Sequence, residues 1–139
     1  MTTDVRERYY LKYQDEISEL PAPWVFFFTC NVSVSKQNLL RVNMFDEGYD
    51  GSWGCEDNDL GYRLHKNHIK IKLCRAAESF HYPHQEDADA KVEQGYRNCQ
   101  YFNSKFDTPE TNLFLKHYKD IAISESIDIN EKLLLLEKE

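Results

Sequence analysis

An aromatic run, Trp24 to Phe28, most constrains how this 139-residue chain can fold, and it directly follows Pro21-Ala22-Pro23. Five apolar residues are far fewer than the roughly 20 that a membrane-spanning helix requires. Extended through Cys30, the run is rich in aromatic and β-branched residues, which are typical of a buried strand. The prolines end any helix that comes before it. We therefore expect a helix that stops near Leu20, followed by a buried strand.

The overall composition excludes several classes of protein. Aromatic residues make up 14% of the chain, which is too many for a disordered tail. The formal net charge of −7 argues against a broad nucleic-acid-binding surface. The four cysteines form no C-x-x-C pair, so we expect free thiols in an intracellular protein. Because the N-terminus lacks an apolar signal run, we expect a cytoplasmic location, with membrane association only through a longer parent protein.

Hydrophobic periodicity divides the chain into three parts. Apolar residues at three- and four-residue intervals predict an amphipathic helix over 4–20, so residues 1–23 form an N-terminal helical part. Residues 24–85 contain the buried strand, a helical turn around 37–42, a helix over 56–67, an alternating strand over 69–73 and a short strand near 78–82. Residues 86–139 predict a helical C-terminal extension. The fold class is thus α/β, with a few-stranded sheet, flanking helices and a helical tail.

The densest group of reactive side chains lies in Trp53-Gly54-Cys55-Glu56-Asp57-Asn58-Asp59-Leu60. Three carboxylates fall in the first turn of the predicted helix, where the helix dipole and free N–H groups favour their ionised form. An ionised carboxylate can act as a general base at neutral pH. The simpler interpretation is helix capping, with Asp59 also paired to Arg63 at the i, i+4 spacing.

The histidines give a second candidate site. His65 and His68 form an H-x-x-H pair, and His81 and His84 form another. Four neutral imidazoles could surround a zinc ion. Solvated histidines are the commoner outcome at such positions, and the first pair lies beside lysines.

In order along the chain, several motifs together resemble part of a known enzyme family. The chain resembles the C-terminal half of a GT-A glycosyltransferase. The likeness is greatest to family 2 enzymes such as the chondroitin polymerases, and also to the β-1,4-galactosyltransferases. The resemblance covers about residues 24–85. It rests on Asn31-Val32-Ser33, Phe45-Asp46-Glu47, Trp53 to Leu60, Arg63-Leu64 and His81.

The resemblance implies roles for the residues around the helix start. Asp57 would be the catalytic base of an inverting enzyme, and Glu56 would hydrogen-bond the acceptor. Trp53 would stack on the acceptor sugar, while Gly54 and Asn58 would complete the substrate-binding surface. The family usually carries an acid at the position of Asn58, which leaves the acceptor sugar open. The implied substrates are a nucleotide-sugar donor, in particular a UDP-sugar, and a glycan acceptor.

The resemblance also implies a divalent metal, usually Mn²⁺. His81 matches the metal-binding histidine of these families, with His84 as the alternative. The family completes the metal site with a D-x-D motif in a preceding nucleotide-binding half, and only one predicted helix precedes Trp24 here. Neither 57–59 nor 87–89, which fit the D-x-D letters, has the required position. We therefore expect the partner of this chain to be a missing N-terminal donor-binding half, and the isolated chain to be inactive.

Two other functions stay open at this point. A non-catalytic carbohydrate-binding module would keep the acceptor surface and use Trp53 and Tyr49 as stacking aromatics. A self-associating structural module, forming a homo-oligomer, would use an exposed sheet edge and the leucine-rich tail.

Overall fold

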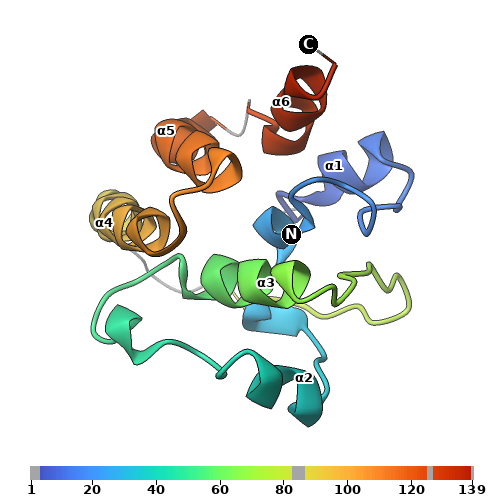
Figure 1. Ribbon diagram of the computed structural model, residues 1–139, viewed down its shortest axis with the longest axis horizontal. Helices are drawn as coiled ribbons and strands as arrows, with labels where there is room; N and C mark the ends of the chain where they lie inside the picture. The colour runs from blue at the N-terminus through green and yellow to red at the C-terminus, as the bar shows by residue number, and fades with distance from the viewer. Residues whose placement is uncertain (1–3, 83–86, 125–126, 139) are drawn as a thin grey trace.

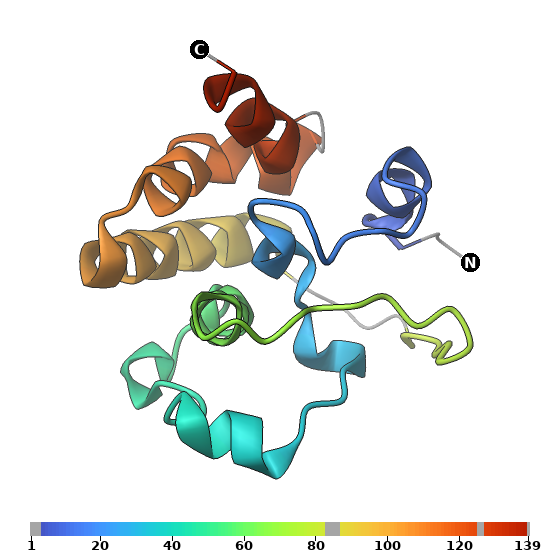
Figure 2. The ribbon, with the colours of Figure 1, turned by 45° about the vertical axis from the view of Figure 1, so that its right-hand side comes forward.

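The structure, a computed structural model, describes residues 4–82, 87–124 and 127–138 (Figure 1). Helix α3 crosses the middle of the molecule, with α2 on one side and the pair α4 and α5 on the other (Figures 1 and 2). None of the described helices has the length and apolar character needed to cross a membrane. The helices are α1 (Glu7–Lys12), α2 (Lys36–Arg41), α3 (Glu56–Lys66), α4 (Ala88–Phe106), α5 (Pro109–Ser124) and α6 (Ile129–Leu136), with 3₁₀ turns η1 (Pro23–Phe26), η2 (Thr29–Asn31) and η3 (Glu47–Tyr49).

The predicted α/β fold with a sheet is wrong, because the described residues form helices and turns and contain no strand. Trp24, Phe26 and Phe27 are buried as expected, whereas Cys30 at the end of the run is exposed, and the run folds into η1 and then η2. Pro23 stands at the start of η1. Its fixed φ suits a first helical turn, and it has no N–H to donate to a neighbouring strand. Burial of this run was predicted correctly, and its backbone conformation was not.

The second expected strand, residues 69–73, shows why the alternation was misleading. Ile69, Ile71 and Leu73 are half-buried, whereas Lys70 and Lys72 are exposed, so the side chains alternate as predicted. A strand also needs a neighbour that accepts and donates backbone hydrogen bonds. No described segment pairs with 69–73 in this way, nor with the third expected strand at 78–82.

The helix predictions from residue 56 onward agree better with the structure. The expected helix over 56–67 is α3, and the Thr108-Pro109-Glu110 signal marks the start of α5. The Asp87 carboxylate caps α4 by accepting the Ala90 N–H at 3.0 Å. The N-terminal helix is much shorter than predicted. It ends at Lys12, and Gln14 and Asp15 beyond it have positive φ angles, which a helix cannot continue through.

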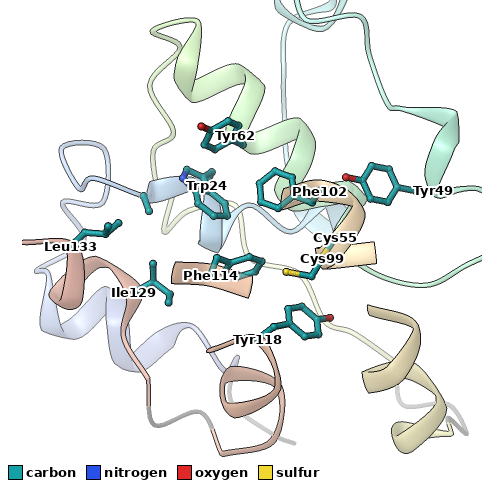
Figure 3. Packing of buried hydrophobic residues seen from close by; sticks show 11 residues of the cluster. Trp24, Tyr49, Cys55, Tyr62, Cys99, Phe102, Phe114, Tyr118, Ile129 and Leu133 are labelled. Atoms are coloured by element: carbon teal, nitrogen blue, oxygen red, sulfur yellow. The ribbon is translucent and has the colours of Figure 1, made fainter. Parts of the chain in front are cut away.

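Trp24 of η1 is fully buried at the centre of the main core (Figure 3). Its ring meets those of Tyr62 in α3, Phe102 in α4 and Phe114 in α5, with centroid distances of 5.4, 5.4 and 5.1 Å. All three contacts are edge-to-face, which is a favourable arrangement for aromatic rings. One side chain thus joins η1 to three helices.

We predict that Trp24→Ala lowers the free energy of unfolding by about 3–5 kcal/mol, because it empties the centre of this cluster. Trp53 is a matched control, since its side chain is 47% exposed, and Trp53→Ala should cost about 1 kcal/mol or less. Urea unfolding of both variants measures the difference. Equal losses would show that Trp24 does not hold the core together.

Candidate functional site

The start of α3 depends on an unusual backbone geometry. Gly54 and Cys55 both have positive φ angles, 95° and 68°. Gly54 also lies against Gly95 of α4, so closely that a Cβ on Gly54 would come within 3.1 Å of the Gly95 Cα. The Asn98 side chain of α4 donates to the carbonyl oxygens of Trp53 and Gly54, at 3.2 and 2.8 Å. Helix α4 therefore holds the turn that precedes α3.

Two thiols lie beneath this turn. The structure describes all four cysteines as free thiols, and Cys55 and Cys99 are buried. They lie side by side near Tyr118 (Figure 3), and the Cys55 thiol also donates to the Gly95 carbonyl at 3.6 Å. The hydrogen bond with Cys99, together with burial, raises the pKa of the Cys55 thiol well above its ordinary value. These thiols pack as small apolar groups in the core.

Asp57, the predicted base, and Glu56, predicted to bind the acceptor, have different surroundings. Asp57 accepts two hydrogen bonds from Thr29: the Thr29 N–H donates to Oδ2 at 3.0 Å, and the Thr29 hydroxyl donates to Oδ1 at 2.5 Å. Glu56 is half-buried, and its Oε2 has no hydrogen-bond partner among the described residues. Burial, together with the charge of Asp57, raises the pKa of Glu56.

The other predicted substrate-binding residues divide into exposed and buried ones. The Trp53 ring is 47% exposed, with the Lys91 ammonium 5.2 Å from its centroid, and the Trp53 N–H donates to the Gln94 side chain. Gly54 and Asn58 are buried. The Asn58 amide donates inward to the Trp24 carbonyl at 3.3 Å. Trp53 is thus the predicted residue whose side chain offers a surface to a ligand.

Asp59 belongs to a buried charge network instead. Its side chain is fully buried and pairs with Arg63, which confirms the i, i+4 ion pair predicted from the sequence. It also accepts hydrogen bonds from Tyr49, at 2.9 Å, and from Lys105 of α4. Lys105 contacts Asp46 as well, and so bridges two acids.

Lys105 was not among the residues predicted from the sequence. Tyr101 and Lys105 have the i, i+4 spacing, and both contact Asp46. The spacing places them on one helix face. It does not reveal a partner more than 50 residues away. The Lys105 ammonium, together with the Gly48 N–H, lowers the pKa of Asp46 to about 2.

The residues predicted to bind metal do not form a metal centre within the described ranges. No group of three His, Cys, Asp or Glu side chains there is placed to hold an ion. His81 lies on the exposed segment that follows α3. His84 lies outside the described residues, and so does any site built from both H-x-x-H pairs. The described residues therefore do not fit a complete Mn²⁺ site.

Comparison with protein families identifies the class of protein. Residues 13–85, more than half of the chain, match the family described as the N-terminal domain of galactosyltransferase. The chain belongs to this glycosyltransferase family. The matched segment includes Trp53, Asp57 and His81, and it ends before α4. The description names an N-terminal domain, so our expectation of a C-terminal half stays a prediction.

Individual relatives agree with this class. The validoxylamine A glucosyltransferase of Streptomyces hygroscopicus subsp. jinggangensis is 36% identical over 71% of this chain and 23% of its own length. The uncharacterized glycosyltransferase YfnE of Bacillus subtilis is 29% identical over 95% of this chain and 37% of its own length. The chondroitin synthase of Escherichia coli is 33% identical over 52% of this chain and 10% of its own length. The chain thus spans well under half of the relatives it matches, and no solved structure matches it.

We predict that Lys105→Met lowers the free energy of unfolding at pH 7 by about 1–3 kcal/mol, because the fully buried Asp59 carboxylate loses a charged donor. Lys119→Met is the matched control. It removes an exposed pair with Glu93 and a cation–π contact with the Tyr96 ring, and should cost less than about 1 kcal/mol. Urea unfolding of both variants is the measurement, and equal effects would contradict a structural role for the network.

The same variant should change the response to acid. Because the pKa of Asp46 is lowered on folding, its stabilising contribution is present above about pH 4 and is lost as the pH falls toward 2. The contribution is less than about 1 kcal/mol, since Asp46 is solvent accessible. Between pH 4 and pH 2 the stability of Lys105→Met should therefore fall less steeply than that of the wild type.

Proposed function

We propose that this chain forms the acceptor-binding part of an inverting glycosyltransferase, which transfers a sugar from a UDP-sugar to a hydroxyl group of a glycan. Membership of the galactosyltransferase family supports the transferase class. The observation that carries the site assignment is the Asp57 carboxylate, held by Thr29 in the first turn of α3 and close in sequence to the exposed Trp53 ring.

Asp57 would serve as the general base. As the acceptor oxygen forms its bond to the anomeric carbon, the bond from that carbon to the nucleoside diphosphate breaks, and the hydroxyl proton passes to the Asp57 carboxylate. A carboxylate has about four lone-pair positions, of which Thr29 occupies two. Two positions are therefore left to accept the acceptor hydroxyl. Attack from the side opposite the leaving group inverts the anomeric centre.

Glu56 and Trp53 would bind the acceptor sugar. The raised pKa of the Glu56 carboxyl and its unpartnered oxygen, within the described part of the chain, suit a group that hydrogen-bonds an incoming hydroxyl. The exposed Trp53 ring offers an apolar face to the C–H groups of a sugar. Lys91 of α4 lies over this ring, and the Gln94 side chain of α4 accepts the Trp53 backbone N–H. Gly54 and Asn58 support this surface from the core.

The donor and the metal form a separate part of the proposal. Mn²⁺ would stabilise the leaving diphosphate, and His81 would be one of its ligands. The described residues do not supply a three-ligand group. The remaining ligands would lie outside the described residues.

We predict that acceptor binding requires both Trp53 and Asp57. The 139-residue chain is titrated by calorimetry with disaccharides ending in glucose, galactose, glucuronic acid or N-acetylhexosamine. Trp53→Ala and Asp57→Ala should each weaken the binding disaccharide about tenfold, because one removes the ring and the other the acceptor of the hydroxyl proton. Glu137→Ala, an exposed acid of the C-terminal segment, is the control. Sensitivity to Trp53→Ala alone would favour a non-catalytic binding module, and no binding of any disaccharide would contradict the proposal.

We also predict that UDP binds this chain no more tightly with Mn²⁺ than without it, because the described residues lack a three-ligand group. Calorimetric titration of UDP with and without Mn²⁺ is the measurement. Mn²⁺-dependent binding that disappears in His81→Ala would contradict this expectation and would place a donor site within the chain itself.

A further inference from the structure

We infer that Thr29 is the positioning residue of the Asp57 carboxylate, an inference that rests on the proposed function only in treating Asp57 as the base. The two residues are 28 positions apart, in η2 and α3. They are joined by two hydrogen bonds from one residue to the two oxygens of one carboxylate. A two-point contact of this kind fixes both the position and the rotation of the carboxylate plane.

The alternative role of Asp57, capping its own helix, is not what the structure shows. The N-cap residue of α3 is Cys55, whose side chain makes no capping hydrogen bond. An acid in the first turn of a helix usually interacts with the free N–H groups there. The Asp57 carboxylate accepts instead from a residue of another element. The tie to Thr29 therefore sets a direction that local helix geometry would not give.

The element that carries Thr29 is itself held in place. In η2, the Asn31 side chain donates to the Ala77 carbonyl at 2.7 Å. The Ala77 segment is also tied to the N-terminal region, because Arg75 pairs with Glu7 and Asp15. His81 follows four residues after Ala77. One short turn thus contacts both Asp57 and the segment that leads to the predicted metal ligand.

The two hydrogen bonds of Thr29 can be separated by substitution. Thr29→Val removes the hydroxyl donor with almost no change in shape and keeps the N–H, whereas Thr29→Ser keeps both donors. Thr108→Val is the control, because the Thr108 hydroxyl is hydrogen-bonded to Tyr62, at 3.1 Å, and accepts the Thr111 N–H, at 3.3 Å, at the start of α5. A loss of general stability would affect both valine variants, and a loss of carboxylate positioning would affect only the first.

The test begins with NMR of the 139-residue chain without any ligand. The Thr29 amide proton and the Asp57 carboxyl carbon are followed from acidic to neutral pH. We expect the amide shift to follow the ionisation of Asp57 with the same midpoint, and the response to disappear in Asp57→Asn. An amide shift that does not change with pH, or that changes equally in Asp57→Asn, would overturn the assignment.

The second measurement uses the same disaccharide panel. We expect Thr29→Val to weaken binding about three- to tenfold, Thr29→Ser to restore it, and Thr108→Val to leave it unchanged. Wild-type binding by Thr29→Val would overturn the assignment. If no disaccharide binds the wild-type chain, the proposed function fails, whereas the amide titration still decides the role of Thr29.

Discussion

Burial of the Trp24 ring is the contact on which the rest of this structure depends. It is the point where η1 meets α3, α4 and α5. The same residue also orients the start of α3, because its carbonyl oxygen accepts the Asn58 amide. The first turn of α3 carries Glu56 and Asp57. Packing of one aromatic side chain and placement of the two candidate site carboxylates are thus parts of the same arrangement.

A second constraint comes from charge. Asp59 is fully buried, and a buried carboxylate is tolerated only where charged or polar donors compensate its lost hydration. Arg63, Lys105 and Tyr49 supply those donors from α3, α4 and η3. Such a network stabilises one relative placement of these elements over others, because any other placement would leave the buried charge without donors. The loop between α2 and α3 is held against α4 in this way.

The features that the sequence predicted correctly are local ones. The starts of α3 and α5 and the Asp59–Arg63 pair depend on residues within a few positions of one another. Burial of the aromatic run was also predictable, since it depends on hydrophobicity alone. The lack of a sheet among the described residues was not predictable, because a strand is defined by its hydrogen-bonded neighbour. Alternation over 69–73 is equally compatible with an extended segment that has no such neighbour. The contacts of Thr29 and Lys105 with acids 28 to 59 residues away lay beyond the reach of sequence spacing.

Helix α4 lies beyond the segment that matches the galactosyltransferase family, yet the site depends on it. Gly95 lets both the turn before α3 and Tyr118 of α5 approach α4 closely, since a Cβ on Gly95 would lie 3.2 Å from the Trp53 ring and 2.0 Å from the Tyr118 hydroxyl oxygen. Asn98 holds the carbonyl groups of that turn, and Gln94 holds the Trp53 N–H. The segment from Trp53 to Leu60 supplies the reactive side chains, and α4, which lies outside the matched segment, sets their spacing. Substitutions in α4 can therefore reshape the proposed acceptor surface while every residue from Trp53 to Leu60 stays the same.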